Sequence, residues 1–283
     1  MRKRPDLFKR ILPLFVIAVS SIAFFVFAEG KDAVKPRPVI VRAVTYNICG
    51  LPDAIIRERD LPRAKDRFPE IGMQLRKYDI AALQEVFVPE RTLIEKKLFM
   101  RFIARGTDSG IIGAPGSGIY IFSRWKMPKF MFERWTDITD YDAMSHKGFV
   151  AATVEIERGP VIDVYSLHAQ AGHQKYRMKN YEQLFAAMKQ YSLGSGRPIL
   201  VLGDFNCEMR EPECKWIVAN AGLTHVSANP APDQIDHIFY NQNGSDWNIS
   251  VISSQFVFDK PLLNGKMLSD HNGYEAVLQF EKK

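Results

Sequence analysis

Short apolar runs that each end in a polar side chain constrain the fold of this chain more than any other feature. Six such motifs follow one another along the chain: TYNICG, LQEV, YSLHAQ, VLGDFN, QIDHIF and LSDHNGY. Short runs rich in β-branched and aromatic residues predict β-strands. We therefore expect the ends of these strands to meet at one rim of the fold, where loops can hold a functional site.

The polar residues of the six motifs comprise four carboxylates, two carboxamides and two histidines. Oxygen ligands suit a hard divalent cation, and histidine titrates near neutral pH and can transfer protons. The set therefore predicts metal-assisted acid–base chemistry at a phosphate. Its members are Asn47, Glu85, His168, Asp204, Asn206, Asp236, Asp270 and His271.

The acids and amides also have plainer interpretations. Asp204 and Asn206 fit an Asx turn that ends a strand, and Asp270 fits a surface turn. Glu85 closes an apolar run, and an acid that leaves a buried strand is costly unless it is paired or metal-bound. Its plainer interpretation is a strand-end carboxylate that reaches water.

The histidines divide in the same way. His168 fits either a proton-transfer role or a core histidine. Asp236 lies on a predicted strand, where it could orient a histidine across the site. His237 is its neighbour, and because side chains alternate along a strand we expect it to point to the opposite face as a structural residue. Three further histidines lack a motif and receive no role: His146, His173 and His225.

The rest of the chain mixes β-hairpins with helical crossovers. Residues 149–157 and 161–168 predict a hairpin, and the nearly all-apolar 198–206 predicts a strand buried on both faces. Pro69 is expected to break or restart a helix. The predicted helices cover 61–77, 90–99, 175–193 and 213–222, and a Gly-rich loop covers 105–117. We expect two β-sheets packed face to face, with helices on the outside.

Residues 1–28 indicate a targeting segment. A basic cluster precedes eighteen uncharged residues, 11–28. This predicts a secretory signal peptide, with an uncleaved signal anchor as the alternative. Both predict an exported protein that is secreted or periplasmic, or anchored in a membrane through residues 11–28. A polar linker, 29–38, then leads to a single domain over 39–283, which is long enough for a full core.

The charge of the chain comes largely from this leader. The whole chain has 38 basic and 32 acidic residues, a net charge of +6. Residues 1–28 contribute five basic and one acidic residue, so 33 basic and 31 acidic residues remain, a net charge of +2. A domain so close to neutral lacks the strongly basic footprint of a typical nucleic-acid binder.

The three cysteines leave two interpretations open. Cys207 and Cys214 could form a disulfide in an oxidising compartment. Alternatively, they and Cys49 are small buried thiols.

Taken in order, the motifs resemble those of the endonuclease/exonuclease/phosphatase superfamily, the DNase I-like group of Mg²⁺-dependent phosphodiesterases. Within it the chain looks most like the neutral sphingomyelinase branch. The resemblance covers residues 40–280 and includes NICGLPD, SGIIGAPGSGIYIFSRW, SHKGFV and QIDHIFY besides the motifs above. It implies a four-layered α/β (α+β) sandwich, in which two mixed β-sheets pack face to face between outer helices.

The resemblance also implies a metal site. Glu85 would be the main Mg²⁺ ligand, and Asn47 would support the metal or its bound water. Asp270 would lie close enough to bind the metal or a second ion. Mn²⁺ is a possible substitute for Mg²⁺, because both accept oxygen ligands and retain waters.

The remaining motif residues acquire catalytic roles from the resemblance. His271, oriented by Asp236, would be the general base that activates water, with Asp204 as a rival. His168 would assist the leaving alcohol as an acid. Asp204 and Asn206 would orient the nucleophile and grip the phosphate.

The predicted function is that of an exported Mg²⁺-dependent phosphodiesterase that cleaves a phospholipid headgroup ester. Sphingomyelin, cleaved to ceramide and phosphocholine, is the first choice of substrate, so the expected partner is a phospholipid or a membrane surface. Alternatives with the same fold are a secreted DNase that binds nucleic acid and a phosphoinositide phosphatase. A non-enzymatic binding scaffold is disfavoured because none of the eight site residues is missing. We expect a monomer.

Overall fold

The computed structural model describes residues 37–107 and 116–283, which lie within the unit Lys35–Lys283. The predicted leader over 1–28 lies outside the described residues, as do most of the linker and the middle of the Gly-rich segment. Among the described helices, none is long and apolar enough to cross a membrane.

Two six-stranded mixed β-sheets form the centre of the fold. From edge to edge, the first contains β11 (Trp247–Val257), β12 (Gly273–Lys282), β1 (Val39–Gly50), β2 (Ile80–Val86), β4 (Tyr120–Ser123) and β3 (Phe102–Arg105). The second contains β5 (Lys129–Arg134), β6 (Gly148–Glu155), β7 (Val161–His168), β8 (Ile199–Asp204), β10 (Asp236–Asn241) and β9 (Thr224–His225). Apolar side chains from the inner faces of both sheets form one core between them, including Ile80, Val164 and Leu202.

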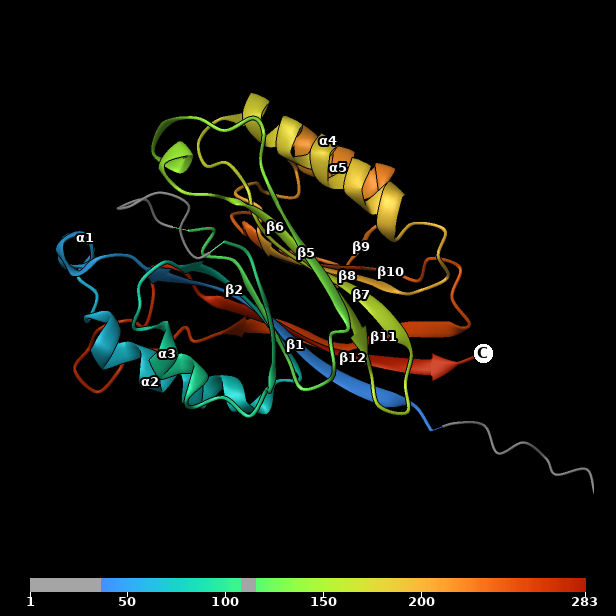
Figure 1. Cartoon of the computed structure of the whole chain (residues 1–283), viewed down its shortest axis with the longest axis horizontal. Helices are drawn as coiled ribbons and strands as arrows, with labels where there is room; N and C mark the ends of the chain where they lie inside the picture. Colours follow the sequence, from blue (N-terminus) through green and yellow to red (C-terminus); the bar gives the residue numbers. More distant parts are fainter. Residues whose placement is uncertain (1–36, 108–115) are drawn as a thin grey trace, which may run out of the picture. The chain divides into compact units, whose positions relative to one another are not determined.

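Helices cover the outer face of each sheet (Figure 1). α2 (Ala64–Gln74) and α3 (Arg91–Glu95) pack against the first sheet, with Phe68, Ile71 and Ile94 in the core that they share with it. α4 (Gln174–Tyr191) and α5 (Pro212–Asn220) pack against the second sheet through Leu184 and Ile217. The predicted sandwich of two sheets between helices is therefore confirmed.

Local sequence explains most of these elements. β6 and β7 form the predicted hairpin, and all six residues of β8 are buried, as expected of a central apolar strand. Pro212 stands at the first position of α5, where its missing N–H costs no helical hydrogen bond. The helices begin and end within a few residues of the predicted bounds, except that α3 is shorter.

The break expected at Pro69 does not occur. Pro69 lies inside α2, which continues to Gln74 and is extended by a 3₁₀ turn, η1 (Leu75–Lys77). The carbonyl that loses its donor belongs to Lys65, an exposed residue, so water can satisfy it. Burial of Phe68 and Leu75 then holds the helix together across the proline.

Several elements were absent from the sequence prediction. They are the short helix α1 (Asp53–Glu58), the 3₁₀ turn η2 (Asp140–Met144), and the strands β3, β5 and β9. β3, β5 and β9 lie at sheet edges, where few residues are buried and the apolar pattern is weak.

The topology brings the ends of six segments to one end of the sandwich. β1 and β2 run parallel, as do β7 and β8, so each pair ends on the same side. β10 and β12 run antiparallel to β8 and β1, so they begin there. Asp204 lies directly opposite Asp236 and beside His168 in the second sheet.

Gly203 allows β7 and β8 to approach closely just before Asp204. A Cβ atom at this position would lie 2.3 Å from the Leu167 carbonyl oxygen. We predict that Gly203→Ala lowers the free energy of unfolding by about 1–3 kcal/mol, because backbone atoms must move apart. Gly194→Ala is the control, because its Cβ would meet no atom within 4 Å and only the cost of its positive φ remains. Urea denaturation measures both, and equal losses would contradict the close-packing explanation.

Candidate active site

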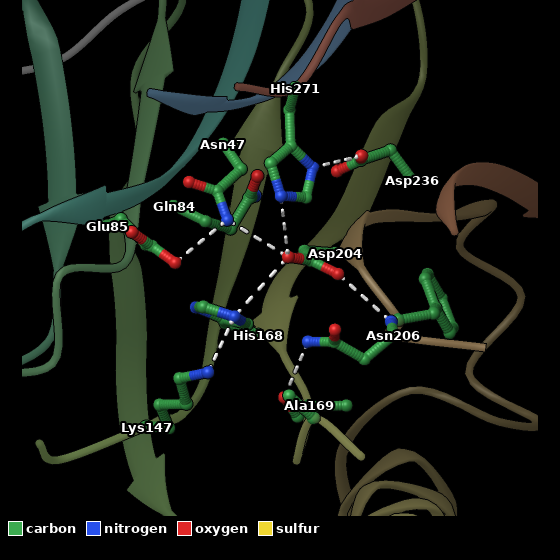
Figure 2. Close-up of polar contacts among 12 residues, drawn as sticks. Asn47, Gln84, Glu85, Lys147, His168, Ala169, Asp204, Asn206, Asp236 and His271 are labelled. Carbon is green, nitrogen blue, oxygen red and sulfur yellow. Dashed lines mark hydrogen bonds and ion pairs between the residues drawn. The ribbon is translucent and has the colours of Figure 1, made fainter. Parts of the chain in front are cut away.

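Seven of the eight predicted residues lie together at the shared end of the two sheets (Figure 2), and the eighth, Asp270, adjoins His271 in the chain. Asn47 and Glu85 come from the ends of β1 and β2. His168 and Asp204 end β7 and β8, and Asp236 begins β10. Asn206 follows β8, and Asp270 and His271 precede β12. A single polar cluster therefore spans the rim between the sheets.

Asn47 connects carboxylates from both sheets. Its side-chain nitrogen donates to Glu85 Oε1 at 3.1 Å and to Asp204 Oδ2 at 3.0 Å. Its side-chain oxygen accepts from the backbone N–H of Cys49 at 3.1 Å. In this geometry Asn47 holds the two carboxylates in place. The role that the resemblance implied for Asn47 at the metal stays a prediction.

Glu85 presents the donor that best suits a metal ion. Oε1 accepts from Asn47, but Oε2 is buried and has no hydrogen-bond partner among the described residues. Burial raises the pKa of Glu85, while Lys147 and the hydrogen bond from Asn47 oppose that rise. A buried carboxylate oxygen without a partner is costly, and a bound cation would remove the cost. The residue also adopts a left-handed conformation, with φ of 57°.

Asp270 is held differently. Its Oδ2 forms an ion pair with Arg59, and its Oδ1 accepts from Ser269 at 3.3 Å. Burial raises its pKa, but His271 and Arg59 outweigh that effect and lower it overall. Asp270 can bind a metal ion only if its carboxylate contacts the ion and Arg59 together, or if the ion pair with Arg59 breaks. Arg59 was not predicted as a site residue because nothing in its local sequence points to the rim.

Asp236, His271 and Asp204 form a chain of polar contacts. Asp236 Oδ2 lies 2.7 Å from His271 Nδ1, and His271 Nε2 lies 4.0 Å from Asp204 Oδ2. Burial lowers the pKa of His271, but the hydrogen bond to Asp236 and the charges of Asp236, Asp204 and Asp270 raise it to about 10. Burial, with the charge of Asp236, raises the pKa of Asp204 to about 6. The charges of His271 and Asp204 also affect each other's pKa.

Ligand atoms of the same three residues lie within 4.8 Å of one another. This spacing could also accommodate a cation. However, His271 Nδ1 is already hydrogen-bonded to Asp236, and the arrangement has the orientation expected of an acid–base histidine with its carboxylate. The orphaned oxygen of Glu85 is the stronger indication of where a metal binds.

Lys147 is a site residue that sequence reasoning missed. Its ammonium group is buried 2.7 Å from His168 Nε2 and forms an ion pair with Asp142. Asp142 in η2 also accepts from the backbone N–H of Ala171 at 2.7 Å. The only available signal was its place before an apolar strand in SHKGFV, because a lone lysine there is usually solvated.

His168 lies between Lys147 and Asp204. Its Nε2 is 3.3 Å from Asp204 Oδ2, and its Nδ1 is buried with no partner in the described part of the chain. Burial, the charge of Lys147 and the charge of His271 lower its pKa well below 6.5. This lowered pKa favours the neutral imidazole. The acid role that the resemblance implied for His168 stays a prediction.

Asn206 forms the Asx turn that was its plainer interpretation. Its backbone N–H donates to Asp204 Oδ1 at 2.9 Å, and its φ is 52°. Its side-chain nitrogen donates to the Ala169 carbonyl at 3.0 Å, which ties the ends of β7 and β8 together. This leaves the side-chain oxygen of Asn206 as the group that can contact a ligand.

Histidines and cysteines that were not predicted to belong to the site make contacts outside the cluster. His237 is buried on the far side of its strand, where it contacts the Cys207 carbonyl and His225. His173 forms an exposed ion pair with Asp140. The three cysteines are buried free thiols, so Cys207 and Cys214 do not form a disulfide in this structure.

A model of the endonuclease/exonuclease/phosphatase family matches residues 44–271. A sphingomyelinase from Mycobacterium tuberculosis is 30% identical over 264 residues, which cover 84% of this chain and 52% of the relative. The chain thus spans about half the length of the curated relatives it matches.

Solved structures show the same fold at low sequence identity. A β toxin variant from Staphylococcus aureus with bound magnesium ions has a TM-score of 0.65 and 15% identity, over 87% of this chain and 100% of that chain. A mannosyl-6-phosphatase from Bacteroides thetaiotaomicron has a TM-score of 0.67 and 15% identity, over 84% of this chain and 99% of that chain.

We predict that Asp236→Asn lowers the pKa of His271 from about 10 toward its ordinary 6.5, because the variant loses the charge of Asp236 and a strong acceptor. The raised pKa stabilises the fold fully below pH 6.5, and this contribution is lost as the pH rises through about 10. In EDTA, the wild type should therefore lose stability over this range, and Asp236→Asn should lose much less.

NMR titration of the His271 ring and urea denaturation at several pH values measure the two effects. Asp233→Asn, a change at an exposed acid near β10, is the control and should behave as the wild type. An unchanged His271 titration in Asp236→Asn would contradict the assigned pairing.

Proposed function

Because this chain belongs to the endonuclease/exonuclease/phosphatase family, we propose that it is a Mg²⁺-dependent phosphodiesterase that cleaves a phospholipid headgroup ester. The observation that carries the proposal is that Asn47 contacts both parts of the site. It donates to Glu85, whose Oε2 has no hydrogen-bond partner among the described residues, and to Asp204, the last member of the Asp236–His271–Asp204 chain. A metal donor and a proton-transfer group thereby face one small region. Sphingomyelin is the first substrate to test, since a mycobacterial relative is a sphingomyelinase.

Glu85 would hold the cation through Oε2, and Asp270 would contribute a second carboxylate. Mg²⁺ suits this all-oxygen donor set, and Mn²⁺ is the natural substitute. The magnesium ions bound to the S. aureus β toxin variant support the choice. When bound, the cation would offset the charge of the phosphate and polarise its oxygens.

The protein's own groups would manage the protons. Asp236 fixes His271 Nδ1, so Nε2 faces Asp204 and the site. The proton released by an attacking water would pass to the His271–Asp204 pair, whose members are held in different protonation states by their surroundings. The pair also contains the proton that the departing alcohol requires.

Lys147 and His168 would contact the phosphate from the other side. The Lys147 ammonium group is the charged donor there, and the neutral His168 ring would position the phosphate by hydrogen bonding. We propose this role in place of the acid role that the resemblance implied for His168. Export through residues 1–28 and a monomeric state remain predictions.

A substrate panel tests the proposal. The protein is incubated with sphingomyelin in detergent micelles, plasmid DNA or a phosphoinositide, each with Mg²⁺ or with EDTA. We expect Mg²⁺-dependent release of phosphocholine. We do not expect cleavage of DNA, because a nearly neutral domain has little general attraction for nucleic acid. Plasmid nicking or phosphate release from the phosphoinositide, without phosphocholine, would overturn the substrate assignment.

Two substitutions separate the metal from the proton-transfer groups. His271→Ala should lower kcat by roughly 10²- to 10⁴-fold with little change in the Mg²⁺ midpoint, because a proton carrier is lost. Glu85→Gln should raise the Mg²⁺ midpoint, and excess Mg²⁺ should restore part of the rate. His173→Ala, at an exposed ion pair, is the matched histidine control and should retain the wild-type rate. If His173→Ala were as damaging as His271→Ala, the assignment of the site would be wrong.

A further inference from the structure

Arg67 in α2 is a buried cation that the proposed chemistry does not use. Its side chain is fully buried. Within the described part of the chain, its hydrogen-bond partners are backbone carbonyls and not carboxylates. Burial lowers the pKa of Arg67, and the nearby charges of Asp270 and Glu85 oppose that effect without a direct ion pair among the described residues. Burial of a charge without a contacting carboxylate is costly, and the carbonyl contacts offset part of that cost.

The carbonyls come from three separate segments. Arg67 Nε donates to Pro62 at 3.0 Å, within the turn that leads into its own helix. Nη1 donates to Ile48 and, at 2.8 Å, to Leu268, and Nη2 donates to Cys49. One guanidinium group thus connects the end of β1 to the segment that precedes β12.

Both connected segments hold site residues. Ile48 and Cys49 directly follow Asn47, whose amide positions Glu85 and Asp204. Leu268 lies two residues before Asp270 and three before His271. A second link runs parallel, because Ser269 Oγ donates to the Asn47 carbonyl at 2.7 Å. Movement of either segment would change the separation between the metal donors and His271.

We propose that Arg67 is a positioning residue, which sets the distance between the Asn47–Glu85 side of the site and the Asp270–His271 side. Its effect on turnover rests on the proposed function. Arginine suits this role because its planar group presents five donors in a fixed fork, whereas lysine presents three donors on one nitrogen. A lysine at this position keeps the charge but cannot reach all three segments at once.

Arg67→Lys and Arg67→Met test the proposal beside a matched pair of controls. Arg177 in α4 is also a buried helical arginine, but it pairs with Glu213 and Glu211, neither of which belongs to the eight site residues. Arg177→Lys and Arg177→Met should therefore lower the melting temperature without affecting the site. Circular dichroism shows whether each variant folds. If Arg67→Met does not fold, Arg67→Lys alone tests the proposal.

Three readouts follow the site. They are the Mg²⁺ concentration that half-saturates the rise in melting temperature, the separate values of kcat and KM, and the NMR signals of the His271 ring in EDTA. We expect Arg67→Lys to raise the Mg²⁺ midpoint and lower kcat by about 10- to 100-fold each, as for other groups that hold ligands in place. The His271 ring signals should shift, and KM should change less than kcat.

Two results would overturn the positioning role. One is wild-type behaviour of Arg67→Lys in all three readouts, which would show that the charge suffices. The other is an equal change in Arg177→Lys, which would show a general loss of stability. If the wild type cleaved no phosphodiester, the proposed function would fail, but the Mg²⁺ midpoint and the His271 signals would still test Arg67.

Discussion

The hydrogen bonds of the Asn47 amide are the contacts on which the site depends. One neutral nitrogen donates to Glu85 from the first sheet and to Asp204 from the second. Both carboxylates are largely buried, where like charges repel strongly and each oxygen needs a donor. The amide satisfies two of these oxygens without adding a charge, and it fixes the separation between the two sheets at the rim.

Cations surround the carboxylates on the remaining sides. Arg59 pairs with Asp270, and Lys147, which directly precedes β6, contacts His168. Arg67 binds backbone carbonyls next to the site, including that of Leu268. Burial raises the pKa values of Glu85 and Asp204, whereas at Asp270 the charges of His271 and Arg59 outweigh burial and lower the pKa. Paired groups with separated pKa values are what acid–base catalysis requires.

The sequence predicted the sandwich because its central strands have strong local signals. β8 is apolar throughout and β6 and β7 flank a short turn, so periodicity and turn residues identify both. The edge strand β5 was missed because its residues are largely exposed. The break predicted at Pro69 was wrong because the packing of Phe68 and Leu75 outweighs the local tendency of proline to end a helix.

The sequence by itself determined which side chains could do the chemistry, since each follows a strand and strand ends of this topology share a rim. It did not determine what those side chains contact. Asn47 and Asp204 are 157 positions apart, yet their contact decides which atom of the amide faces the site. Tertiary structure likewise decided the lowered pKa of His168, the pairing of Asp270 with Arg59 and the buried position of Lys147. Hydrogen bonds and pKa values depend on distance and burial in space, and neither can be read from the order of residues along a chain.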